Sequence, residues 1–107
     1  MSTNEYIAKL NEYKARYKGE DPLSKKRAVV EAISTIWYNY ETKKHMIGTG
    51  KGIKTCNIPA KYLLDNTNDE IANTIRNMDG IFMPNTYKGY LDRLLGQVID
   101  YINTIAE

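Results

Sequence analysis

The sequence predicts an all-α fold: a bundle of four to five helices with a short Gly/Lys-rich hairpin or loop inserted around residues 45–58. Three observations predict it. Apolar residues recur at helical spacing in several segments, capping residues and prolines stand at segment ends, and the insertion has three glycines and no helical period. With 107 residues, 42% of them hydrophobic, we expect residues 1–107 to form a single helical domain around one core.

Two helices are predicted before the insertion. Residues 2–18 have apolar side chains at spacings of four, three and four, and Gly19 follows where a helix would end. Asp21-Pro22 suits the start of a second helix that runs to about Lys44, because the Asp side chain caps free N–H groups and proline fits the first turn. A strand over residues 34–40 is the alternative, and the length of the apolar stripe favours the helix. That stripe consists of Val29, Val30, Ile33, Ile36, Trp37 and Tyr40.

The insertion itself is predicted as a β-hairpin with arms over residues 44–48 and 52–58, and an open loop is the alternative. A short helix is expected to follow over residues 59–64, with Pro59 near its first turn.

Thr67 and Glu70 next form the pattern of a capping box, in which a Thr hydroxyl and a Glu carboxylate satisfy free N–H groups at a helix start. Asp79-Gly80 ends the helix that this box begins. Residues 81–84 are an apolar linker that we expect to pack under the bundle. The helix that the capping box begins carries Ile71, Ile75 and Met78 on one face.

The last predicted helix begins at Asn85 or Thr86 and runs almost to the C-terminus. Its apolar stripe, widened by further apolar residues beside it, is broad enough for a bundle helix. Gly89 and Gly96 lie one heptad apart on the same side, a spacing that permits close approach of another helix. The stripe is also a candidate oligomer interface, made by Tyr87, Leu91, Leu94, Val98, Tyr101 and Ile105.

The charge pattern points to an anionic ligand. Between Thr42 and Leu64 the chain has five lysines and one histidine and no acidic residue, with three glycines among them. Cations beside backbone that approaches a ligand closely suit phosphate groups. The candidate phosphate-binding residues are Lys43, Lys44, Gly48, Gly50, Lys51, Gly52 and Lys54.

The asymmetry of charge extends over the whole chain. Residues 1–62 have twelve Lys and Arg against six Asp and Glu, whereas residues 63–107 have three against seven. Such a division indicates either a basic ligand-binding face opposite an acidic one or attraction between the two halves within the fold.

Two tyrosines are candidates for stacking on a base or for contact with a partner. Tyr38 and Tyr40 flank Trp37, and on a helix these three side chains cannot all face one core. We expect Tyr38 at least to point away from the Trp37 stripe, near the basic end of the same helix.

The patterns of known catalytic and cofactor sites do not fit. A Walker A loop needs Ser or Thr after its Gly-Lys pair, and here Gly52 follows Gly50-Lys51. A dinucleotide fingerprint fails because Ile53 stands where its third glycine is required. His45 and Cys56 are the only residues of their types, so no zinc site of the usual composition forms within one chain. We therefore expect no catalytic residue, no metal, no cofactor and no enzymatic activity.

Two hypotheses of function follow from the sequence. The first is a non-enzymatic binding protein for a phosphate-bearing anionic ligand, nucleic acid rather than a nucleotide. The second is a protein–protein interaction module, such as a small inhibitor, adaptor or assembly factor, that uses the C-terminal apolar helix and surface tyrosines. We expect such a module to form a homodimer.

The remaining features set the expected context. The single cysteine, the polar N-terminus and the lack of a long apolar run predict a cytoplasmic protein with no membrane segment. The small size and the abundance of Lys, Ile and Asn suit a regulatory or accessory protein of a phage or other mobile element.

Overall fold

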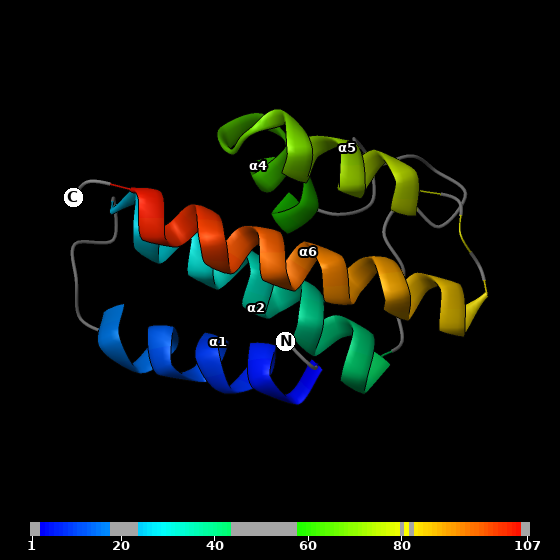
Figure 1. Ribbon diagram of the computed structural model, residues 1–107, viewed down its shortest axis with the longest axis horizontal. Helices are drawn as coiled ribbons and strands as arrows, with labels where there is room; N and C mark the ends of the chain where they lie inside the picture. Colours follow the sequence, from blue (N-terminus) through cyan, green and yellow to red (C-terminus); the bar gives the residue numbers. More distant parts are fainter. Residues whose placement is uncertain (1–2, 18–23, 44–57, 80, 82, 106–107) are drawn as a thin grey trace.

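The computed structural model describes residues 3–17, 24–43, 58–79, 81 and 83–105. Within these ranges the chain forms five α-helices and no strand (Figure 1). The predicted all-α bundle is therefore confirmed, and the strand alternative for residues 34–40 is wrong because they lie inside the second helix. The hairpin or loop predicted around residues 45–58 lies outside the described residues, except for Ile58. The helices are α1 (Thr3–Tyr17), α2 (Lys25–Lys43), α4 (Ile58–Asn66), α5 (Asp69–Met78) and α6 (Pro84–Thr104).

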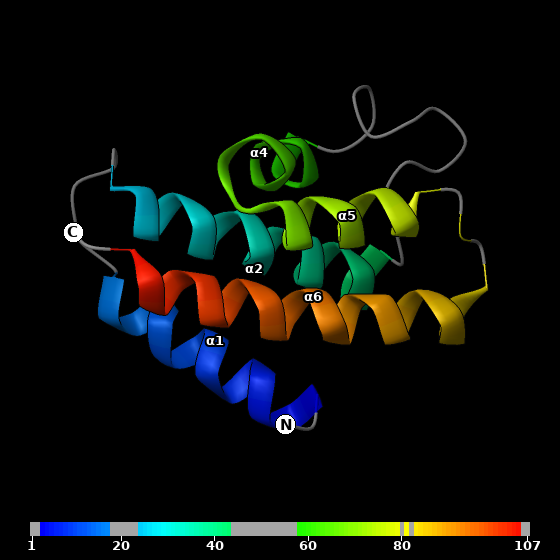
Figure 2. The same cartoon turned by 45° about the horizontal axis from the view of Figure 1, so that its top comes forward.

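The helices pack in three layers, as Figures 1 and 2 show. α2 and α6 lie side by side and antiparallel in the middle layer, α1 covers one side of them, and the α4–α5 pair covers the other. In the outer pair, α4 packs on α2 and α5 packs on α6. Both central helices therefore contact neighbours on two sides, which is why the apolar stripe of α6 is so wide.

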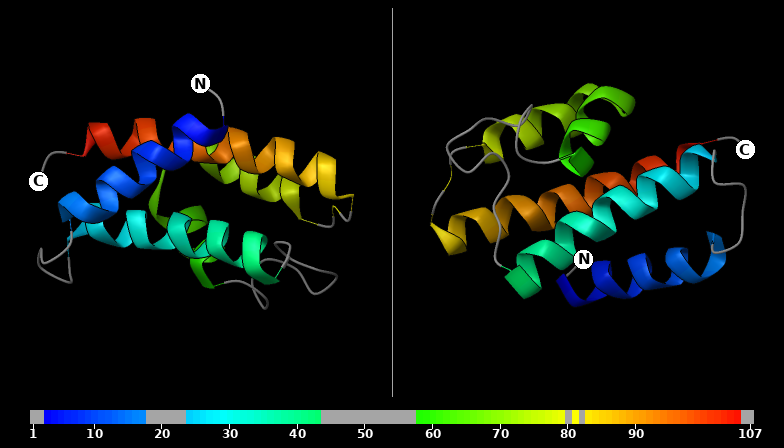
Figure 3. Two further views of the ribbon diagram at one scale, coloured as in Figure 1. Left: turned by 90° about the horizontal axis from the view of Figure 1, so that it is seen from below. Right: turned by 180° about the vertical axis from the view of Figure 1, so that it is seen from behind.

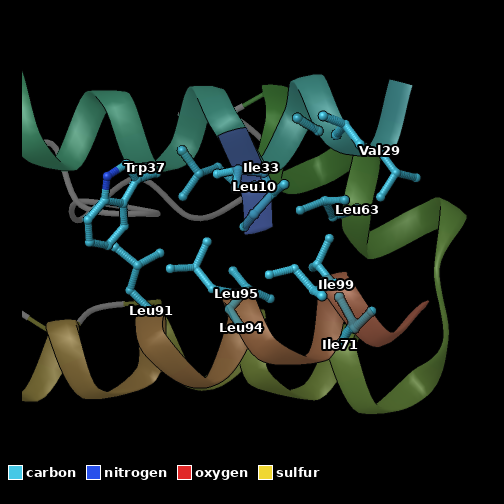
Figure 4. Close-up of a cluster of buried hydrophobic side chains, with 14 of the residues drawn as sticks. Leu10, Val29, Ile33, Trp37, Leu63, Ile71, Leu91, Leu94, Leu95 and Ile99 are labelled. Carbon is cyan, nitrogen blue, oxygen red and sulfur yellow. The ribbon is translucent and has the colours of Figure 1, made fainter. Parts of the chain in front are cut away.

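One hydrophobic core takes side chains from all five helices. In its centre, side chains of α2 and α6 point toward one another, among them Ile33 and Leu95 (Figure 4). Leu10 from α1, Leu63 from α4 and Ile71 from α5 complete the cluster. Each fully buried Leu or Ile contributes roughly 1.5–3 kcal/mol through the hydrophobic effect, so the periodic apolar residues hold the layers together.

α2 begins three residues later than the Asp21-Pro22 signal suggests. Lys25 is its first residue, and the Ser24 carbonyl accepts a hydrogen bond from the N–H of Ala28 at 3.0 Å. The Ser24 hydroxyl accepts a long hydrogen bond of 3.5 Å from the N–H of Arg27. Ser24 thus stands at the N-cap, and the Asp21-Pro22 pair lies outside the described residues.

The capping box predicted from Thr67 and Glu70 is wrong, because the cap of α5 is Asn68. The Asn68 side chain accepts a hydrogen bond from the N–H of Ile71 at 3.0 Å. The Thr67 hydroxyl instead donates to the carbonyl of Leu63 in the preceding helix. Glu70 does not reach back either; its carboxylate accepts from the side-chain amide of Gln97 in α6 at 3.2 Å.

The segment before α6 is only partly packed under the bundle. Ile81 is half-buried against the core, whereas Met83 is 69% exposed, and Phe82 lies outside the described residues. α6 itself begins with Pro84, where the missing N–H of proline costs no helical hydrogen bond.

The two glycines of α6 have different surroundings. A Cβ atom on Gly96 would lie 2.8 Å from the hydroxyl of Tyr6, so the absence of a side chain lets α1 approach α6 closely. A Cβ on Gly89 would have no neighbour within 4 Å. The predicted role in close helix approach is therefore met by Gly96 and not by Gly89.

Candidate functional site

The predicted phosphate-binding residues lie almost entirely outside the described part of the chain. Lys43 is the last residue of α2, and the other six (Lys44, Gly48, Gly50, Lys51, Gly52 and Lys54) fall in residues 44–57. Their role stays a prediction from the sequence. At the far end of the acid-free stretch, Lys61 of α4 forms an ion pair with Asp65 one turn later, so a carboxylate balances its charge.

The structure separates the two candidate stacking tyrosines. Tyr38 is 57% exposed, which confirms that it points away from the Trp37 stripe. Tyr40 is half-buried; its ring stacks on Tyr87 with 5.5 Å between centroids and lies 5.7 Å from Trp37. Tyr40 therefore belongs to the core, and only Tyr38 is available to a ligand or partner.

The candidate oligomer interface along α6 is part of the core of the single chain. Four of its six residues (Tyr87, Leu91, Leu94 and Val98) are at most 1% exposed. Tyr101 and Ile105 are half-buried against the same core, and the Tyr101 hydroxyl donates to the carbonyl of Asn66 at 3.2 Å. The interpretation of the α6 stripe as an oligomer interface is therefore corrected, because neighbouring helices of the same chain already cover these residues.

A groove between α1 and α2 lies beside Tyr38. Its first part is a pocket of about 490 Å³ lined by Lys14, Ala15, Tyr17, Arg27, Val30 and Glu31. Its second part, of about 340 Å³, is lined by Lys14, Glu31, Ser34, Thr35 and Tyr38. Because Lys14 and Glu31 line both parts, the two adjoin, and we call the whole the α1–α2 groove.

The path of α1 explains why this groove is open. Figure 3 (left) shows α1 crossing the middle layer obliquely, with its first half over α6 and its last half beside the start of α2. Tyr6 in the first half accordingly packs on Gly96, whereas Lys14 in the last half lines the groove with Arg27. α1 therefore leaves the C-terminal half of α2 uncovered on this side, where Tyr38 is exposed.

In the part of the groove beside Tyr38, the α2 wall offers mainly hydrogen-bond acceptors, whereas Arg27 lines the other part with a guanidinium. The Ser34 hydroxyl donates to the carbonyl of Val30 at 2.6 Å, and the Thr35 hydroxyl donates to the carbonyl of Glu31 at 2.8 Å. A hydroxyl has one proton, so the remaining capacity of both is to accept. The Glu31 carboxylate is an acceptor too, with one oxygen 3.0 Å from Nε of Arg27. The exposed ammonium of Lys14 stands on the α1 wall.

Sequence reasoning identified Tyr38 and missed the rest of the groove. The signal was present as a polar stripe at helical spacing along α2, formed by Arg27, Glu31, Ser34, Thr35 and Tyr38. Such a stripe is most often a solvated helix face, so it predicts a groove only once the position of α1 is known.

The charge asymmetry of the chain divides the helices by their order in the sequence, so that it separates α2 from α6 within the middle layer. The helices α1 and α2 carry seven Lys and Arg against four Glu. The described residues from 58 to 105, which form the other helices and their connections, carry four Lys and Arg against six Asp and Glu. The groove thus lies in the basic part of the molecule, and the stretch of lysines begins at the end of α2 in that same part.

A second pocket, of about 530 Å³, lies between the start of α1 and α6. Of its described lining residues, two are carboxylates, Glu70 and Asp100, and one is a cation, Arg93, so it does not suit a phosphate. Among the described residues, no three His, Cys, Asp or Glu side chains are grouped to hold a metal ion, and His45 and Cys56 lie outside them. None of the helices in the described ranges combines the length and the apolar character needed to cross a membrane.

Comparison with known proteins gives no match: no family model, no curated protein and no solved structure is similar to this chain.

Proposed function

We propose that this protein is a small non-enzymatic binding protein that engages a phosphate-bearing polyanion, nucleic acid rather than a nucleotide. The observation that carries the proposal is the stretch between Thr42 and Leu64, with five lysines and no acidic residue. Lys43, Lys44, Lys51 and Lys54 are its phosphate contacts, and the N–H groups of the three glycines add hydrogen bonds. Cations spread along a stretch suit repeated phosphates, and neither nucleotide-binding loop fits the sequence.

The charge distribution of the described helices supports this proposal. The lysine stretch begins at the end of α2, within the basic part of the molecule formed by α1 and α2. A polyanion is attracted to a surface of net positive charge before it makes contact, so the surface of α1 and α2 is favoured for the approach of a nucleic acid. Lys61 is not included among the contacts, because Asp65 already pairs with it.

Fluorescence anisotropy of a labelled random-sequence DNA duplex tests the proposal. We expect micromolar binding that weakens between about 50 mM and about 200 mM salt, with a log–log slope of about one unit per phosphate contact. The double variant Lys51→Glu with Lys54→Glu reverses two contacts and should weaken binding at least about tenfold.

The matched control reverses two exposed cations elsewhere, Arg76→Glu with Lys88→Glu, which changes the net charge by the same amount. We expect this control to retain most of the affinity. Two results contradict the proposal: no binding of either duplex or single-stranded nucleic acid by the unmodified protein at low salt, or equal losses in the two double variants.

Protein–protein interaction is the second candidate. Its predicted interface along α6 is buried. Among the described residues, the large exposed apolar side chains that remain for a partner are Tyr38, Ile58 and Met83, of which the last two are 86% and 69% exposed. Single exposed apolar residues are common on soluble proteins, and for this reason we rank this candidate lower. A dimer in sedimentation at micromolar concentration, together with indifference to DNA, would reverse the ranking. Under both candidates the protein acts in the cytoplasm and without catalysis.

A further inference from the structure

Tyr38 differs from every other tyrosine of the chain. All nine tyrosines are described, and the other eight are buried or half-buried, whereas Tyr38 is 57% exposed. Among the described residues its ring has no aromatic neighbour and its hydroxyl has no hydrogen-bond partner. Its ring is therefore available for a ligand to stack on.

The residues around Tyr38 add complementary chemistry. Glu31, Ser34 and Thr35 lie on the same face of α2, and all three present acceptors to the groove. Lys14 faces them from α1 with a cation. In this part of the groove, the Tyr38 ring, a wall of acceptors and the cation of Lys14 match a nucleotide unit, which has a flat base, amino donors on that base and a phosphate.

We infer that the α1–α2 groove binds an unpaired base of a single-stranded nucleic acid. The base stacks on Tyr38, its amino group donates to the acceptors of α2, and the neighbouring phosphate contacts Lys14. This base site rests on the proposed function and narrows its ligand, because the bases of a duplex are paired and stacked and do not reach an exposed side chain without being flipped out.

The acceptors also predict which of the two pyrimidines is preferred. Cytosine has an amino group with two donor protons at N4, where thymine has the acceptor O4, and the one donor of an unpaired thymine, N3–H, stands between two carbonyl oxygens that the acceptors of the groove repel. An acceptor wall therefore favours cytosine, and oligo(dC) should bind more tightly than oligo(dT) of the same length and charge. One hydrogen bond corresponds to a difference of roughly threefold to tenfold in affinity.

Anisotropy titrations with labelled oligo(dC), oligo(dT) and the random-sequence duplex test the inference. We expect Tyr38→Ala to weaken oligo(dC) binding about tenfold or more and to leave duplex binding within about twofold. Tyr38→Phe keeps the ring and should bind oligo(dC) like the unmodified protein. Lys14→Gln should reduce the salt slope for oligo(dC) by about one unit. Titration with oligo(rC) of equal length shows whether ribose or deoxyribose is preferred. The inference is supported if either oligo(dC) or oligo(rC) binds tightly.

Met83→Ala is the matched control, because it also truncates an exposed apolar side chain, outside the groove. Circular dichroism of each variant verifies that the helices are retained.

Failure of the base site is distinguishable from failure of the proposed function. Duplex binding that Lys51→Glu with Lys54→Glu abolishes, together with oligo(dC) binding that Tyr38→Ala leaves unchanged, overturns the base site alone. No binding to any nucleic acid overturns both, and an equal effect of Tyr38→Ala on strand and duplex overturns the preference for single strands.

Discussion

At the residue scale, Asn68 and Thr67 satisfy backbone groups on opposite sides of the junction between α4 and α5. Asn68 accepts from the N–H of Ile71 at 3.0 Å, and Thr67 donates to the carbonyl of Leu63. A helix start leaves its first N–H groups without partners, and an N–H left unpaired is costlier than a carbonyl, which has two lone pairs. The Asn68 hydrogen bond should therefore matter more to stability than that of Thr67.

We expect Asn68→Ala to lower the free energy of unfolding by about 1 kcal/mol, because it removes the cap of α5. Asn68→Asp should retain most of the stability, since Asp caps equally well, and Thr67→Ala should cost less than Asn68→Ala. Urea unfolding followed by circular dichroism measures these differences. A larger cost for Thr67→Ala would favour the capping box of Thr67 and Glu70 over the cap that the structure has.

The junction between α4 and α5 shows how precisely a sequence locates the start of a helix. Thr67 and Asn68 are both good N-cap residues, so the sequence locates a helix start to within a residue or two. The choice between them depends on where α4 ends, and α4 is held by its packing on α2, which is a tertiary contact. Tyr38 and Tyr40 are a different case: helical spacing already places Tyr40 on the apolar stripe and Tyr38 away from it, and the structure adds that Tyr40 stacks on Tyr87 of α6.

At the element scale, α6 is a central helix with two glycines in unlike surroundings. Gly89 has open space where a Cβ would be, whereas a Cβ on Gly96 would lie 2.8 Å from the Tyr6 hydroxyl oxygen and 2.9–3.2 Å from two atoms of its ring. Alanine is favoured over glycine inside a helix by about 1 kcal/mol at both positions. At Gly96 the displacement of the Tyr6 ring opposes this gain.

We expect Gly89→Ala to raise the free energy of unfolding by about 1 kcal/mol, and Gly96→Ala to be at least about 1 kcal/mol less stable than Gly89→Ala. Urea unfolding of the two variants under identical conditions makes the comparison. The control introduces Gly96→Ala into a Tyr6→Leu background, where the shorter side chain leaves room and the gain should return. Equal stabilisation by both alanines would show that Gly96 is not needed for the approach of α1.

The helices could be predicted because the signals that specify them are local. Apolar residues at positions such as Tyr6, Leu10 and Tyr13 repeat within one helix, and the structure places all three against the core. The α1–α2 groove could not be predicted, since it depends on the oblique course of α1 over two other helices (Figure 3). The stripe of α6 shows the same limit: a broad apolar face predicts burial, but not whether helices of the same chain or a second copy provide the cover.

At the scale of the whole molecule, the basic and acidic parts of the chain pack against each other. Two explanations of the asymmetry compete: attraction between the parts stabilises the fold, or the basic part binds a polyanion. The ion pairs between described residues are Arg16–Glu12, Arg27–Glu31 and Lys61–Asp65, and each lies within a single helix. None of these three joins the basic part to the acidic part, although the Lys25 ammonium of α2 lies 5.5 Å from the centroid of the Tyr101 ring of α6. For the charged pairs of the described residues, attraction between the two parts therefore acts over longer distances that salt screens readily.

Salt therefore separates the two explanations. We expect the free energy of unfolding to change by no more than about 1 kcal/mol between about 50 mM and about 200 mM NaCl, because exposed charge pairs contribute little. Over the same range, affinity for nucleic acid should fall roughly a hundredfold if four lysines contact phosphates. Urea is the denaturant for this measurement, since it is uncharged and leaves the ionic strength unchanged. A stability that decreases with salt as steeply as the affinity does would mean that the charge asymmetry serves the fold, and that the basic side is not primarily a surface for a ligand.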